Sequence, residues 1–77
     1  MALITDATTA WSSPRTLATD EIWQTRRGSV FVTTTPAPDA EDGLALWETH
    51  AVRLPAGSEV RYRKEGTTEA VIVSEAV

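Results

Sequence analysis

The side chains that could carry out acid–base chemistry in this chain are Glu48 and His50, which share one face of a predicted strand. A carboxylate beside an imidazole is a typical general acid–base pair. No nucleophile, oxyanion hole or glycine-rich phosphate loop is evident in the sequence near them. We therefore interpret His50 as a structural or exposed residue, and we predict that the chain is not an enzyme.

Metal chemistry is also poorly supported. Asp39, Glu41 and Asp42 place three carboxylates in one loop, but the ligand spacing of an EF-hand, with its glycine and terminal glutamate, is missing. The chain has no cysteine and one histidine, so thiolate sites are excluded and His50 cannot hold zinc or iron unaided. We predict no metal and no cofactor, and we interpret the carboxylates as a solvated acidic loop.

Tryptophan and arginine are the stronger candidates for function, as residues of a protein interface. Tryptophan is a preferred interface anchor because it buries a large area with few rotamers, and three in 77 residues is more than a small core needs. Arginine is favoured for bidentate contacts with carboxylates. The predicted interface residues are Trp11, Trp23, Trp47, Arg53, Arg61 and Arg63.

Each of these groups also has an intramolecular interpretation. If the strands on either side of residues 55–58 pair with each other, the arginines share a face and form a basic strip for an acidic partner. Alternatively, the arginines belong to a solvated sheet face that Glu59 and Glu69 balance across the ladder. Trp11 either anchors its segment on a neighbouring subunit or folds back over its own core. The sequence leaves both alternatives open.

The elements that must position these residues are strands. β-Branched residues, threonine above all, are abundant and suit a pleated, half-buried surface. Neither face of residues 44–54 is purely apolar, so we expect a bulge or a break near Glu48. Alternation and short apolar runs predict strands over residues 17–25, 29–33, 44–54, 59–64 and 69–77.

Glycine and proline mark the turns between these strands. Gly28 is expected to close the first strand pair and residues 65–68 a final hairpin, while Pro55–Ser58 fits a type II turn. The spacing of the turns predicts an all-β fold, a small antiparallel sandwich or barrel of about five to six short strands over residues 15–77. Residues 1–14 lack periodicity, so we predict an extended N-terminal arm that is mobile or ordered only against a partner.

Length and charge limit the functional classes further. One core of this size rarely supplies more than about 3–5 kcal/mol of net stability, so small proteins add disulfides, metals or oligomerisation. With disulfides and metals excluded, this chain can gain additional stability only by oligomerisation or by docking onto a larger surface. The net charge of −4 argues against nucleic-acid binding. The first residues lack a basic signal-peptide region, and no apolar run could span a membrane. We predict a soluble protein, made in the cytoplasm, with no nucleic-acid or membrane partner.

The chain resembles small virion proteins of tailed bacteriophages and phage-like gene transfer agents over roughly residues 17–75. The resemblance is carried by the Pro-Ala-Pro acidic loop with Gly43-Leu44, by Val52-Arg-Leu-Pro-Ala-Gly57, by Val60-Arg-Tyr-Arg63 and by the closing Ala70-Val-Ile-Val73. It implies a capsid decoration (cement) protein on the virion surface. Such proteins form small oligomers, often trimers, that bind the major capsid protein where its subunits meet and stabilise the shell. The resemblance carries over no catalytic residue.

Two other functions are compatible with the same residues. The first is a head-fibre, tail or host-surface adhesion module, in which an exposed tryptophan would stack on saccharide. The second is a small cytosolic β-type regulator that binds DNA, because Leu54-Pro-Ala-Gly-Ser-Glu-Val60 resembles the swapped-hairpin transcription factors. The acidic balance of the chain weighs against the regulator.

Overall fold

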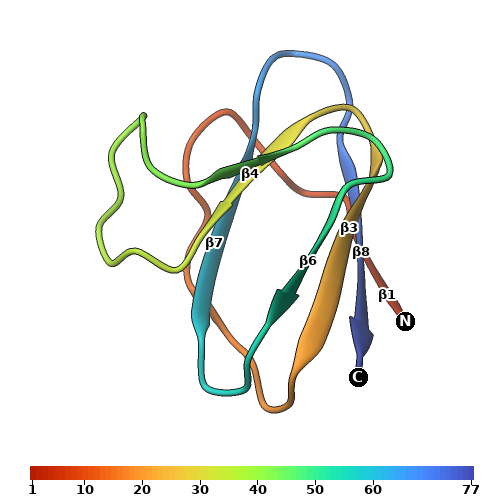
Figure 1. Ribbon diagram of the computed structural model, residues 1–77. Helices are drawn as coiled ribbons and strands as arrows, with labels where there is room; N and C mark the ends of the chain where they lie inside the picture. Colours follow the sequence, from red (N-terminus) through yellow and green to blue (C-terminus); the bar gives the residue numbers. More distant parts are fainter.

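A computed structural model describes residues 1–77 (Figure 1). Its regular elements are all β-strands, joined by turns and loops. Each strand is short, and the longest has seven residues. The strands are β1 (Ala2–Ile4), β2 (Arg15–Thr16), β3 (Glu21–Arg27), β4 (Val30–Thr33), β5 (Leu44–Leu46), β6 (Ala51–Leu54), β7 (Glu59–Lys64) and β8 (Val71–Ala76).

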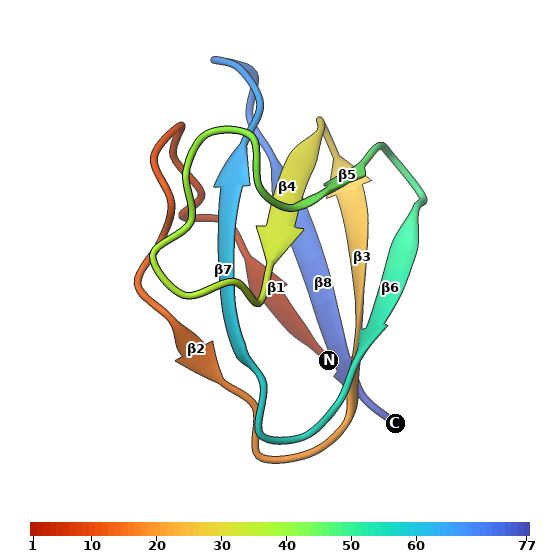
Figure 2. The same ribbon diagram turned by 60° about the vertical axis from the view of Figure 1, so that its left-hand side comes forward.

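The eight strands form two antiparallel sheets of four strands each. The first sheet has the order β1-β8-β3-β6 and the second the order β2-β7-β4-β5. Figure 2 shows the two sheets as separate layers, so the predicted all-β antiparallel fold is confirmed, and of the two predicted architectures it is the sandwich. The prediction of five to six strands missed β1 and the two-residue β2, and it treated β5 and β6 as one strand.

Trp23 lies at the centre of the core between the sheets and is fully buried. Its strand, β3, has β8 on one side and β6 on the other, so its inward side chains lie far from any edge. The ring packs edge-on against Tyr62 of the opposite sheet, with centroids 5.9 Å apart, and its Nε1–H donates to Glu21 Oε1 at 2.9 Å. The prediction that Trp23 is an interface residue is therefore wrong for the single chain, because this tryptophan fills the core.

The predicted break near Glu48 is confirmed, and its cause is a change of sheet. β5 pairs with β4 of the second sheet, whereas β6 pairs with β3 of the first. Thr25 fixes this corner, since its Oγ1–H donates to the Leu46 carbonyl at 3.1 Å and its N–H to the His50 carbonyl at 3.0 Å. The two alternating faces of residues 44–54 therefore belong to two different strands.

The predicted hairpins are wrong, although the turns themselves are present. Three of the predicted turns lead from one sheet to the other, so the strands that they join do not pair. These turns join β3 to β4, β6 to β7 and β7 to β8. Only β4 and β5 are neighbours both in the chain and in a sheet. The turn at 55–58 has Gly57 at a φ of 86° in its third position and a hydrogen bond from the Ser58 N–H to the Pro55 carbonyl, as a type II turn requires.

The N-terminal segment is not a free arm, contrary to the prediction for residues 1–14. β1 pairs with β8, and Ile4 is buried in the core. Further along, the Thr8 carbonyl accepts from the Lys64 N–H at 2.8 Å, and the Ser12 N–H donates to the Tyr62 carbonyl at 2.9 Å. The segment lacks periodicity because it crosses from one sheet to the other, and it is ordered against its own domain.

The turn between β3 and β4 needs glycine at position 28. Gly28 has a φ of 73°, and a Cβ there would lie 2.6 Å from the Glu69 carbonyl oxygen. We predict that Gly28→Ala lowers the free energy of unfolding by about 2–3 kcal/mol, measured by urea denaturation. Gly66→Ala is the matched control, because Gly66 has open space and no positive φ. Equal stability of the two variants would contradict the prediction.

Candidate protein-binding surface

The structure does not bring the predicted arginines together. Arg53 lies on the outer face of the first sheet, whereas Arg61 and Arg63 lie on the outer face of the second. Their strands, β6 and β7, do not pair, so the predicted continuous basic strip is wrong. Arg61 lies opposite Thr33 of β4 and remains half-buried. The three arginines therefore have to be considered one by one.

Arg63 is held by its own domain. Its guanidinium lies between two aromatic rings, 4.2 Å from the Phe31 centroid and 5.1 Å from the Trp11 centroid. Its Nη2–H also donates to the Ala40 carbonyl at 2.8 Å. A planar guanidinium stacks on aromatic faces as an ammonium group cannot. Arg63 thus joins the N-terminal segment, β4 and the acidic loop of residues 34–43.

Trp11 folds back over its own domain, which is the intramolecular alternative that the sequence left open. Its Nε1–H donates to the Asp39 carbonyl at 2.8 Å. Its ring rests on Gly43, where an added Cβ would lie 2.9 Å from the ring. Together with Arg63, Trp11 holds the loop that crosses in front of β7 in Figure 2.

We predict that Arg63→Lys lowers the free energy of unfolding by about 1–2 kcal/mol, because lysine keeps the charge but loses both stacking contacts. The indole N–H of Trp11 should exchange faster with solvent in the variant, as measured by NMR. Arg61→Lys is the control on the same strand and face, with an expected change within about 0.5 kcal/mol. If both variants match the native protein, the stack does not hold the loop.

Arg53 faces solvent and forms an exposed ion pair with Asp20, with 3.1 Å between Nη2 and Oδ2. Asp20 also accepts the Ala56 N–H at 2.8 Å. The hydrogen bond from Ala56, followed by that from Arg53, lowers the pKa of the Asp20 carboxyl below its usual value. Exposed ion pairs contribute little stability. The Arg53 guanidinium can therefore bind another group at little cost to the stability of the domain.

The lowered pKa of Asp20 predicts a pH dependence of stability. Ionised Asp20 favours the folded state above its unfolded pKa of about 3.9, and this contribution is lost as pH falls through the lower folded pKa. Asp20→Asn should therefore be less stable than the native protein at about pH 7, and the difference should shrink as the pH falls through the acidic range. Urea denaturation across this range measures the difference. A difference that is constant with pH would contradict the prediction.

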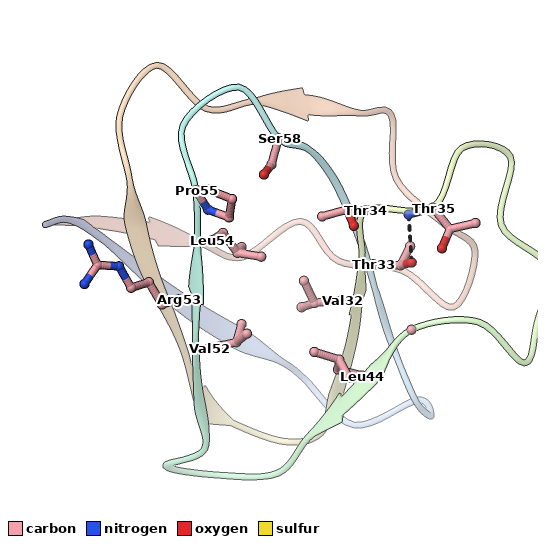
Figure 3. Close-up of a pocket in the computed structure, with 11 residues that line it drawn as sticks. Val32, Thr33, Thr34, Thr35, Leu44, Val52, Arg53, Leu54, Pro55 and Ser58 are labelled. Carbon is pink, nitrogen blue, oxygen red and sulfur yellow. Dashed lines mark hydrogen bonds between the residues drawn. The ribbon is translucent and has the colours of Figure 1, made fainter.

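A groove opens between β5 and β6, which are the edge strands on one side of the sandwich. The two strands diverge from the turn at residues 47–50, and the groove between them has a volume of about 460 Å³ (Figure 3). Its apolar wall contains buried Val32 and Leu54, half-buried Val52 and Leu44, which is 57 % exposed. Leu44 is therefore the only one of the four that is largely exposed, and the groove is a candidate for protein contact because it opens beside two edge strands.

Trp47 is the one predicted tryptophan that is largely available to a partner. It follows β5 directly, at the edge of the second sheet, and is 49 % exposed. Leu44 and Val52, by contrast, were not predicted as interface residues. The mixed polarity of residues 44–54 could have indicated that these residues lie on edge strands, because edge strands expose side chains that a central strand would bury.

The candidate acid–base residues bind backbone groups of nearby turns. Glu48 Oε1 accepts the Gly28 N–H at 3.1 Å, and His50 Nδ1 accepts the Trp47 N–H at 3.3 Å. In the acidic loop, Asp39 and Asp42 likewise accept backbone N–H groups of the loop itself. These contacts support structural roles for the residues concerned.

Comparisons with family models, with curated proteins and with solved structures found no match to this chain. The structure contains no helix of the length and apolar character needed to span a membrane. The functional assignment therefore depends on the surface described above and on the resemblance of the sequence.

Proposed function

We propose that this chain is a non-enzymatic structural protein of a tailed-bacteriophage-type virion, a capsid decoration protein that binds the major capsid protein and stabilises the shell. The proposal depends above all on one observation, the open side of the sandwich, where an apolar groove lies between two edge strands. Binding there would remove apolar area from water, and this burial drives most protein association.

Two of the exposed large apolar side chains lie at the open side of the sandwich, where a partner can reach them. Leu44 and Trp47 lie on one edge of the second sheet, and both are about half exposed or more. An anchor of this kind is typical of interfaces, in which a few aromatic or aliphatic residues supply most of the binding energy. A compact domain of 31 × 25 × 17 Å could lie between larger capsid subunits with this edge buried.

The remaining parts of the proposal come from the resemblance. It implies that the protein is made in the host cytoplasm, assembles on the capsid surface and forms a homo-oligomer, with a trimer favoured. The segments that carry the resemblance correspond to the acidic loop with Gly43-Leu44, to β6 and the 55–58 turn, to β7 and to β8. They therefore include residues of the groove as well as Val60, Tyr62 and Ile72 of the core.

A second function, adhesion to the host surface, is favoured by one observation. Trp47 is an exposed aromatic side chain, and such side chains can stack on saccharide rings. A glycan array separates the alternatives, since a decoration protein should bind no glycan and an adhesion module should bind at least one through Trp47.

The proposed function predicts that the protein co-sediments at a fixed copy number with expanded empty capsids of its own virion. Leu44→Ala should weaken this binding by about tenfold, because it removes an apolar anchor. Leu3→Ala is the matched control, as Leu3 is 59 % exposed but lies on β1, at the other edge of the first sheet. Failure of the native protein to co-sediment would contradict the assignment.

A further inference from the structure

The outer edge of β6 has unpaired backbone groups. β6 pairs only with β3, and the Thr25 N–H donates to the His50 carbonyl next to it. In an antiparallel ladder, alternate residues direct their N–H and C=O groups to the same neighbour. The backbone N–H and C=O of Val52 therefore point toward β3, as the carbonyl of His50 does. The backbone N–H and C=O of Ala51 and Arg53 point away from β3.

No other part of the chain satisfies these outward groups. None of the backbone hydrogen bonds outside the strands involves Ala51 or Arg53. Unpaired N–H and C=O groups along an edge form a template for pairing with another strand. Two consecutive outward residues offer two donors and two acceptors, which is the pattern that one short extended segment would satisfy.

The groove lies directly beside this edge. Figure 3 shows Val32, Leu44, Val52 and Leu54 directed into it from three strands, β4, β5 and β6. Side chains alternate along an extended segment, so every second residue of an added strand would face this apolar wall. The residues between them would lie on the outer face of the first sheet, next to Arg53.

Charge indicates what the outward residues should be. Arg53 is the only charged residue that lines the groove, and no carboxylate lines it. Its guanidinium is exposed and already binds Asp20, but it has donors for a second carboxylate. A second copy of this chain pairing through the same edge would bring another arginine instead. The complementary occupant is a partner segment with an acidic residue.

We propose that an extended segment of a partner protein, apolar at alternate positions and with an acidic residue beside Arg53, adds to β6 as a fifth strand of the first sheet. This inference rests on the proposed function, because the partner would be the major capsid protein. The backbone of Ala51 and Arg53 provides the hydrogen bonds, the groove takes the apolar side chains, and the Arg53 side chain selects the acidic one.

Two variants at position 53 separate the backbone contribution from the charge. Arg53→Gln removes the charge and keeps the N–H, whereas Arg53→Pro removes both, and its missing N–H has no partner in the free protein. In co-sedimentation with expanded empty capsids, Arg53→Gln should bind a few-fold more weakly than the native protein. Arg53→Pro should bind at least about tenfold more weakly than Arg53→Gln. Ala51→Pro, which also removes an outward N–H, replaces Arg53→Pro if the latter does not fold.

Amide hydrogen exchange of the native protein tests the geometry directly. In the free protein the amides of Ala51 and Arg53 should exchange fast and those of Val52 and Leu54 slowly, while on capsids all four should be protected. Capsid binding that is equal for the proline and glutamine variants would overturn this inference and leave the proposed function intact. No capsid binding by the native protein would remove both. A free dimer in which Ala51 and Arg53 are already protected would show that the occupant is a second copy.

Discussion

The contact between Trp23 and Tyr62 across the two sheets is the interaction on which the rest of the structure depends. Both side chains are buried, and their rings meet edge-on at the centre of a core of eleven residues. Tyr62 also organises the N-terminal segment, since its hydroxyl donates to Asp6 at 2.7 Å and its backbone binds Ser12. Burial and the neighbouring Asp6 carboxylate raise the pKa of Tyr62, so the phenol stays protonated and keeps this bond.

Packing the two sheets in this way leaves the two sides of the sandwich unequal. The chain changes sheet at almost every connection, so strand pairing is non-local and depends on the shared core. On one side, the edge strands are β1 and β2. On the other side, β5 and β6 diverge from one turn and leave an apolar groove beside an unpaired edge.

Two arginines that are both predicted to be interface residues have different environments as a result. Arg63 is enclosed by Trp11 and Phe31 and fixes the loop that leads into β5, so it supports one wall of the groove from within the domain. Arg53 has only an exposed partner and lies at the rim of the groove. An arginine that is stacked on aromatic rings contributes to the fold, whereas one with a single exposed carboxylate keeps donors for a partner.

The amino-acid sequence alone determined the segments that form β3 to β8, the turn positions and the break near Glu48, because alternation and turn chemistry are properties of neighbouring residues. It could not show that Trp23 is buried, that Trp11 folds back onto Gly43, or that Arg53 and Arg63 lie on different sheets. These features follow from which strands pair, and that choice is made by the packing of residues far apart in the chain. Only the tertiary structure therefore decided which edge of the domain is left unpaired beside a groove.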